Sequence, residues 1–582
     1  MTYDLKIING TIVDGTGAPR YGGDIGIKDG QIVAVGHAPD DAAERIDAAG
    51  AIVTPGFTDL HTHYDGQISW DSDLMPSSVH GVTTAVLGSC GVGFAPCHAA
   101  DRDKLIALME GVEDIPGTAL AEGLTWEWES FPEYMDALDA MPHSIDFALQ
   151  VTHDPLRVYV MRDRAVHNEL PTDDDIGQMR ALLREALEAG AVGFSTGRTD
   201  NHRSATGAHT PAAEANAREL EGIVAAFDGL DRGVIQAVSD FDMTTGDEHF
   251  DREFDVIEQM AKRAGRPMSI SLMQRDQSPQ QWRWIMRRAE QADAAGIPIR
   301  LQVGARAIGV LLGLNTTFQP FMGFPSYKAI SHLPHAERVA RMRDPELKAQ
   351  MLTEKSEPVA GDGSPIPPLA DLLLAQIEMI GMRMFTLGED PDYEPSLAES
   401  IGARAKMRGE SVLSGLYDAL LQDDGNALIY FPIYNYTEGS LDNVHMMLSH
   451  PLALPGLSDG GAHVGTVCDA SFPTFLMSHW ARDREDGYPL EKIVKMQAHD
   501  TARFVGFNDR GTIAVGQKAD LNIIDFDGLK LRPPELVADL PAGGKRLLQR
   551  AEGYIATIVS GVVIARNGEL TGARPGRLVR SR

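Results

Sequence analysis

The stretch TPGFTDLHTHYDGQ, residues 54–67, marks the point at which the chain changes character. Before it, short apolar runs such as DLKIING, DIGIKDG and QIVAVG end in Asn-Gly or Asp-Gly steps, which are typical of β-hairpin turns. Within it, an apolar run leads to two histidines, His61 and His63, that are separated by one residue. Side chains two residues apart on a strand point to the same face, so we expect both imidazoles to face one side.

After this stretch, short β-branched runs such as GVTTAVLGSCG and IDFALQVTHD alternate with helical segments at 174–190 and 250–265. About eight such units predict an α/β fold, a closed (β/α)8 TIM-like barrel over residues 55–509, whose working groups lie at the carboxyl ends of the strands. Residues 308–425 interrupt the alternation with segments rich in Met, Pro and Asp. We therefore predict that they form an insertion, or lid, over the mouth of the barrel.

The two ends of the chain resemble one another. Residues 512–565 again contain apolar runs separated by Gly-rich turns, as in the first fifty residues. We therefore predict a small β-sandwich domain built from residues 1–54 together with 510–565. Residues 566–582 are basic and rich in Gly and Arg, which predicts either a loose tail or an arm that reaches a neighbouring subunit of a homo-oligomer.

Composition excludes several classes of function. A net charge of −31 argues against binding to the phosphate backbone of nucleic acid. No apolar run reaches the roughly 18 residues that a membrane span needs, and the start MTYDLKIING lacks the features of a signal peptide. The three cysteines, Cys90, Cys97 and Cys468, indicate a reducing compartment without a disulfide framework. We therefore expect a cytoplasmic protein.

Several motifs together resemble a known family. TPGFTDLHTHYD resembles the metal-binding strand of the amidohydrolase superfamily, and WDSDLMPSSVHGVTTAVLGSCGVGFAP (70–96) resembles its N-acyl-D-amino-acid deacylase, or D-aminoacylase, branch. The segments HPLALPGLSDGGAH (450–463) and DRGTIAVGQKADLNIIDFD (509–527) agree with this resemblance. The resemblance implies a zinc-dependent enzyme that hydrolyses the linear amide C–N bond of a small acylated substrate, in the first place an N-acyl-D-amino acid.

Carried over by position, the resemblance assigns roles to four residues. His61 and His63 match metal ligands, Cys90 matches a zinc-binding cysteine, and Asp459 matches an aspartate that touches the metal and transfers protons. Imidazole, thiolate and carboxylate all suit Zn²⁺, so one or two zinc ions are expected. Each residue also has a structural explanation: two histidines beside a turn, a cysteine in the core, and an aspartate that starts a turn.

The chain departs from this branch at the fifth and sixth strands. The corresponding segments, GVIQAVSDFD (233–242) and PMSISLMQRD (267–276), contain no histidine, and Gln274 lies near the place of the branch's substrate-binding lysine. Two explanations follow. Either a single metal is held by His61, His63 and Asp459, with Cys90 as a fourth ligand, or histidines from elsewhere complete the set. The candidates for the second explanation are His153, His202, His209 and His463.

The remaining candidates concern the substrate. Arg157, Arg198 or Arg306 could pair with a substrate carboxylate, because the planar guanidinium suits that group. His153, His202, His463 and Gln274 are further substrate-facing candidates. Two other functions remain open: a cyclic amide hydrolase similar to hydantoinases or dihydroorotases, and a degenerate barrel that binds a ligand without turnover. The first is disfavoured because the fourth strand, GAVGFSTGR, lacks the lysine that those relatives carboxylate.

Overall fold

The structure is a computed structural model that describes residues 2–199, 201–241, 247–360, 366 and 368–581. Asp242, at the end of the predicted fifth-strand segment, lies outside the described residues, as do 361–365 and 367 of the predicted insertion.

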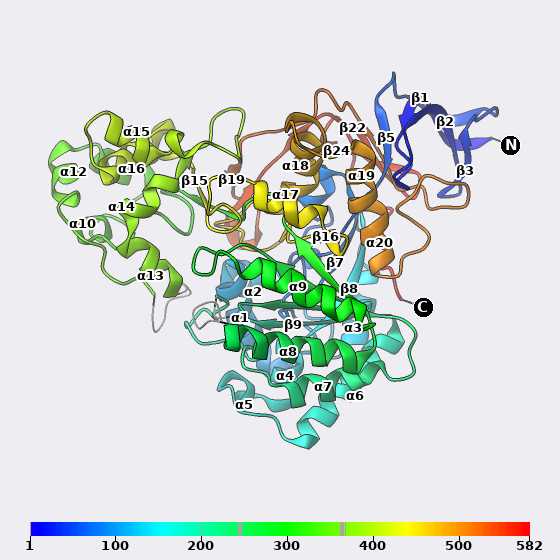
Figure 1. Cartoon of the computed structure of the whole chain (residues 1–582), viewed down its shortest axis with the longest axis horizontal. Helices are drawn as coiled ribbons and strands as arrows, with labels where there is room; N and C mark the ends of the chain where they lie inside the picture. Colours follow the sequence, from blue (N-terminus) through cyan, green and yellow to red (C-terminus); the bar gives the residue numbers. More distant parts are fainter. Residues whose placement is uncertain (1, 200, 242–246, 361–365, 367, 582) are drawn as a thin grey trace.

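Eight parallel strands, in sequence order, form the central sheet of the molecule (Figure 1). A parallel bridge between Thr62 and Gly460 joins the ends of the first and last strands, so the sheet curls into a (β/α)8-like barrel. This confirms the predicted fold. The strands are β6 (Phe57–Asp59), β7 (Val82–Leu87), β8 (Asp146–Thr152), β9 (Gly193–Arg198), β10 (Val234–Ser239), β11 (Met268–Leu272), β12 (Ile299–Val303) and β16 (Ala453–Pro455).

Amphipathic helices cover the outside of the barrel. Helix α6 (Asp173–Ala189) shows why they form: Thr172 and Asp175 cap its first turn reciprocally, and Gly190, at φ 111°, ends it. Its Ile176, Met179 and Leu183 side chains are buried at helical spacing. Further helices are α1 (Arg102–Glu113), α2 (Gly117–Gly123), α3 (Phe131–Asp139), α4 (His153–Met161), α7 (Ala217–Val224), α8 (Asp247–Ala264), α9 (Gln281–Ala294), α17 (Asp442–Ser449), α18 (Phe472–Phe475), α19 (Leu490–Val494) and α20 (Thr501–Phe504).

Strands from both ends of the chain share a second, nine-stranded sheet. Its central pairing is β5 against β17, with Val53 opposite Ile523, and nearly the whole chain lies between these two residues. Alternate side chains such as Ile25, Ile27, Ile523 and Ile558 form its own apolar core. The strands are β1 (Tyr3–Ile12), β2 (Tyr21–Lys28), β3 (Gln31–Gly36), β4 (Ala42–Asp47), β5 (Ile52–Pro55), β17 (Leu521–Ile524), β22 (Tyr554–Val559), β23 (Val562–Arg566) and β24 (Glu569–Leu570).

The segment between β12 and β16 forms a lobe to one side of the barrel (Figure 1). It has its own apolar core, with Phe321, Leu416 and Tyr417 among the buried side chains. A three-stranded sheet in the order β13-β15-β14 joins this lobe to the barrel side. Its elements are β13 (Gly309–Leu312), α10 (Pro325–Lys328), α11 (His335–Met342), α12 (Pro345–Met351), α13 (Pro368–Ala375), α14 (Ile377–Ile380), β14 (Phe385–Thr386), α15 (Ile401–Met407), α16 (Val412–Leu420) and β15 (Ile429–Pro432).

The segment after β24 packs against the barrel rather than lying loose. The amide of Phe147 on β8 donates to the carbonyl of Arg577, and the amide of Val579 donates to the carbonyl of Phe147. Leu578 between them is 8% exposed. Across the described residues, no helix has both the length and the apolar character needed to cross a bilayer.

Candidate metal centre

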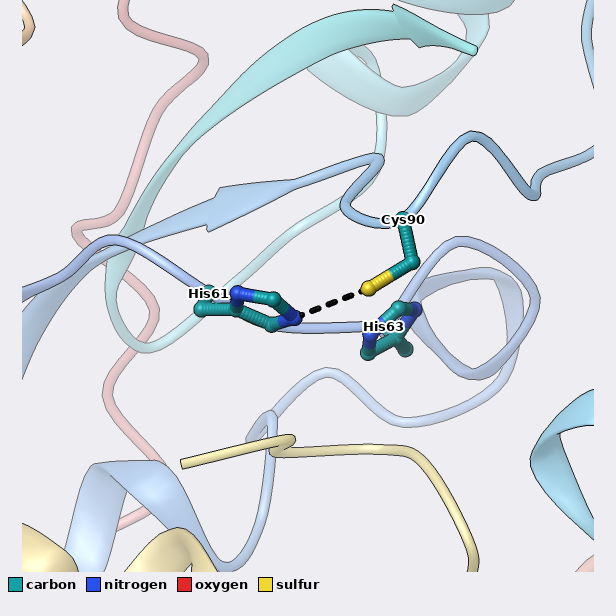
Figure 2. Close-up of side chains that lie close together, drawn as sticks. All are labelled: His61, His63 and Cys90. Carbon is teal, nitrogen blue, oxygen red and sulfur yellow. Dashed lines mark hydrogen bonds between the residues drawn. The ribbon is translucent and has the colours of Figure 1, made fainter. Parts of the chain in front are cut away.

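His61, His63 and Cys90 come together at the carboxyl ends of the first two barrel strands (Figure 2). One ligand atom from each lies within 4.8 Å of the others, and all three residues are buried. The Nε2 atom of His61 lies 3.1 Å from the Cys90 sulfur. The Oδ1 atom of Asp459, which follows the last strand, lies 3.2 Å from Nε2 of His61 and 3.8 Å from Nε2 of His63. The structure thus clusters three of the four predicted ligands, His61, His63 and Cys90, and places the fourth, Asp459, beside both imidazoles.

Each imidazole has a polar side chain on the far side of its ring. Nδ1 of His61 lies 2.7 Å from the Gln302 side-chain oxygen on β12, which can only accept, so Nδ1 carries the proton and Nε2 keeps its lone pair. Nδ1 of His63 lies 3.1 Å from a carboxylate oxygen of Glu113 at the end of α1, without the alignment of a hydrogen bond. In each ring, Nε2 therefore faces the shared point.

The backbone is strained at three residues around this point. Cys90, Asp459 and His463 have φ values of 54°, 50° and 48°, in the left-handed region that residues other than glycine seldom adopt. The amide of Cys90 donates to the Gln236 side-chain oxygen of β10 at 2.7 Å, which holds this conformation in place. Such strain concentrates at functional sites, where the surrounding fold determines the position of a side chain.

The charges of the cluster fit a divalent cation. Burial raises the pKa of the Cys90 thiol well above its usual range, and nearby Asp459 and Glu113 add to this effect. Burial also lowers the pKa of His63 well below its ordinary value, so its ring is neutral. Neutral imidazoles are metal ligands, and a coordinated thiol loses its proton to the cation. Two imidazoles, one sulfur and one carboxylate are a donor set that Zn²⁺ accepts.

The fifth and sixth barrel strands, β10 and β11, each bring a neutral polar side chain to the site. Gln236 on β10 holds the Cys90 backbone. Ser271 on β11 lines the cavity above the cluster, and its hydroxyl has no hydrogen-bond partner among the described residues.

Two of the additional histidines lie beside the cluster. His202 and His463 both line the cavity, with their ring centroids 6.5 Å apart. Burial of the His202 ring, with His463 and His61 nearby, lowers its pKa to about 3. His463 also places Nε2 at 3.9 Å from Glu113. His209 instead forms a backbone bridge with Arg203 in the loop after β9.

The other predicted substrate residues are engaged elsewhere and are not among the described residues that line the cavity. His153 and Arg157 both contact the buried carboxylate of Glu219, at 3.1 and 3.4 Å. Arg198 pairs with Glu253 at 2.7 Å. Arg306 lies 3.3 Å from Asp469 and over the ring of Tyr393, and Gln274 donates to Glu438.

Two residues at the site were not anticipated from the sequence. Glu113 is fully buried against His63, and burial raises the pKa of its carboxyl well above the usual range. Arg275 lines the cavity from the segment after β11. The two-residue spacing of side chains on one face could have revealed Arg275. Ser271, Met273 and Arg275 are each two residues apart, and all three line the cavity.

The cavity has a volume of about 280 Å³ and extends from the cluster towards the lobe. Its charged side chains and histidines come from the barrel side, whereas the lobe contributes mostly apolar side chains, together with Thr317. The apolar side chains of the lobe include Val310, Leu312, Phe318, Leu369, Leu373, Phe431 and Ile433.

Comparison with known proteins agrees with this geometry. The amidohydrolase family model matches residues 44–565. The chain is 28% identical over 617 aligned residues to the uncharacterized protein Rv2913c of Mycobacterium tuberculosis (strain ATCC 25618 / H37Rv), covering 98% of this chain and 93% of that one. It is 37% identical over 196 residues to D-aminoacylase of Alcaligenes xylosoxydans xylosoxydans, covering 34% of this chain and 38% of the relative.

Among solved structures, the N-acyl-D-glutamate deacylase from Bordetella bronchiseptica, in complex with zinc and a phosphonate inhibitor, has the same fold. The TM-score is 0.65 at 24% identity, and the match covers all of both chains. The chain belongs to the amidohydrolase family, which confirms the resemblance predicted from its motifs. It is a hydrolase that acts on carbon–nitrogen amide bonds.

Proposed function

We propose that this protein is a zinc-dependent deacylase of an N-acyl amino acid, most closely of the D configuration. The observation that carries the proposal is the convergence of His61, His63, Cys90 and Asp459 at the floor of a cavity with an apolar wall. The partial identity with D-aminoacylase supports the choice of a linear N-acyl substrate. The absence of lysine from β9, Gly193–Arg198, argues against the carboxylated-lysine centre of the cyclic amide hydrolases.

In this proposal the four side chains hold the metal, and Asp459 also transfers protons. Zn²⁺, when bound, would polarise the scissile carbonyl and lower the pKa of water towards 7. Gln302 holds the ring of His61 in the ligating orientation, and the Glu113 carboxylate lies against the ring of His63. Asp459 accepts a proton from the attacking water and then delivers it to the departing nitrogen, so one carboxylate serves as base and acid in turn.

Replacing Asp459 by Asn tests this assignment. The amide keeps the size of the side chain but cannot accept the proton, so we expect turnover of N-acyl amino acids to fall by about 10²-fold or more. Zinc content per chain and the circular dichroism spectrum should stay close to those of the wild type. Full activity in Asp459→Asn would refute the proton-transfer role.

The number of metal ions is a second part of the proposal. Among the described residues, one group of three or more side chains meets the geometry of a metal site, and it is His61, His63 and Cys90. We propose one tightly held zinc ion, with His202 and His463 facing the substrate. Elemental analysis of the purified protein should give about one zinc per chain, and removal by a chelator should abolish activity until zinc is restored. Two tightly bound ions per chain would contradict this assignment.

A further inference from the structure

Five arginines of the described chain are buried, and one of them differs from the other four. Each of the four has a carboxylate partner: Glu219 for Arg157, Asp469 for Arg306, Asp146 for Arg510 and Asp539 for Arg546. Arg275 is 1% exposed. Among the residues that the structure describes, no carboxylate oxygen lies within the 4.0 Å of an ion pair with it.

The contacts of Arg275 are all to neutral groups. One terminal nitrogen donates to the Ser239 carbonyl at 2.8 Å, and the other donates to the Gln281 side-chain oxygen at 3.1 Å. Its Nε has no hydrogen-bond partner among the described residues. Since a guanidinium has five donor hydrogens, these two contacts leave several N–H groups of Arg275 without an acceptor. Arg275 also lines the cavity that contains the metal cluster, so a molecule in that cavity can reach it.

Asp240 is another charged residue that lines the cavity, and it forms no ion pair with Arg275. Its carboxylate accepts from the hydroxyl of Thr199 at 2.7 Å and from the amide of Asn201 at 3.5 Å. A buried charge without a counter-charge costs several kcal/mol. Arg275 therefore offers a buried positive charge to an anionic group in the cavity.

We propose that Arg275 binds the carboxylate of the substrate and that the lobe binds its acyl chain. The substrate class is then an N-acyl amino acid with an aliphatic acyl group, which deepens the proposed function and rests on it. The planar guanidinium suits a carboxylate, and Leu312, Phe431 and Ile433 offer an apolar surface to a hydrocarbon chain. The sequence suggests Arg157, Arg198 or Arg306 as the partner of the substrate carboxylate. Their guanidinium groups instead pair with Glu219, Glu253 and Asp469, so this role falls to Arg275.

Binding can be measured apart from turnover in the zinc-loaded Asp459→Asn protein. Isothermal titration calorimetry compares N-octanoyl-leucine with N-octanoyl-leucinamide, each as D and L enantiomers. The two ligands differ only in the carboxylate, and a charge-assisted hydrogen bond makes the acid bind about 10- to 100-fold more tightly than the amide. In Arg275→Gln this preference disappears, because binding of the acid weakens while binding of the amide stays the same.

Two further variants separate this role from a structural one. Arg275→Lys keeps a positive charge without the planar fork, so it retains part of the preference for the acid. The matched control is Leu312→Ala on the apolar wall, which weakens acid and amide by the same factor and leaves their ratio unchanged. The Lys variant also covers the case in which the Gln variant does not fold.

Three outcomes overturn the proposal: equal affinities for acid and amide in the Asp459→Asn protein, an unchanged preference in Arg275→Gln, or no binding of either ligand. A wild-type protein that prefers the acid but hydrolyses no N-acyl amino acid would contradict the proposed function and leave the role of Arg275 standing. The two failures are thus distinguishable.

Discussion

At the scale of single residues, the candidate metal centre consists of proposed ligands and of the groups beside them. His61, His63, Cys90 and Asp459 stand in recognisable motifs, and in the structure the first three form one cluster with Asp459 beside the two imidazoles. Glu113 stands in LMEGVED, among other acidic residues, where nothing separates it from a surface carboxylate. Its position against His63 depends on how α1 packs over the barrel mouth, which is a tertiary effect that no local pattern encodes.

The three buried cysteines allow a direct test of the role of Cys90. Cys90→Ser removes a soft ligand, so we expect zinc affinity to fall and the thiolate-to-metal charge-transfer band of the cobalt-substituted protein to disappear. Cys97→Ser is the matched control, since Cys97 is buried to a similar degree but contacts a backbone carbonyl. If the band survives in Cys90→Ser, this cysteine is not a ligand.

At the scale of elements, turn dipeptides show what a local pattern can and cannot decide. Asp29-Gly30 forms the tight hairpin between β2 and β3, with φ values of 50° and 75°, as Asp-Gly steps predict. Asn9-Gly10 was expected to mark a turn too, but it lies within β1, where it forms an irregularity in the pairing with β2. A bulge and a turn both need a residue with positive φ, so the dipeptide alone does not distinguish them.

The glutamine on strand β12 gives a prediction that belongs to this scale. Gln302 accepts from His61 and donates to the Ser269 hydroxyl on β11, so two neighbouring strands fix the ring. Gln302→Leu removes the acceptor, and we expect zinc affinity to fall by about 10- to 100-fold. Chelator competition measures this change.

Gln302→Glu serves as the control, because it keeps an oxygen acceptor at the same place and should stay close to wild-type affinity. Equal zinc affinities in the Leu and Glu variants would show that His61 needs no support from β12.

At the scale of the whole molecule, His80 joins the barrel to the C-terminal part of the chain. It lies just before β7, and its ring contacts the Thr474 hydroxyl at 2.7 Å and the Gln549 carbonyl at 2.8 Å. Burial lowers the pKa of His80 to about 4, the Gln549 contact opposes this shift, and Arg306 adds to it. The imidazole is therefore neutral in the folded protein at neutral pH.

This neutral histidine makes stability depend on pH. Between about pH 4 and 6.5 the unfolded chain binds the proton and the folded chain does not, so stability is lost as pH falls through this window. The slope is at most about 1.4 kcal/mol per pH unit, or about 3 kcal/mol in all. His80→Gln keeps the polar contacts without the titration, so urea unfolding should show a smaller acid loss than in wild type. Parallel pH profiles for the two proteins would contradict this account.

The sheet shared by the two chain ends has a consequence for biosynthesis. Strand β5 pairs with β17, which lies far later in the sequence, so during synthesis β5 waits for β17 to leave the ribosome. In the meantime their edges are unpaired and open to association with other chains. A nascent polypeptide of this kind should depend on chaperone protection until β17 has been synthesised, and a premature stop before Leu521 should yield insoluble product.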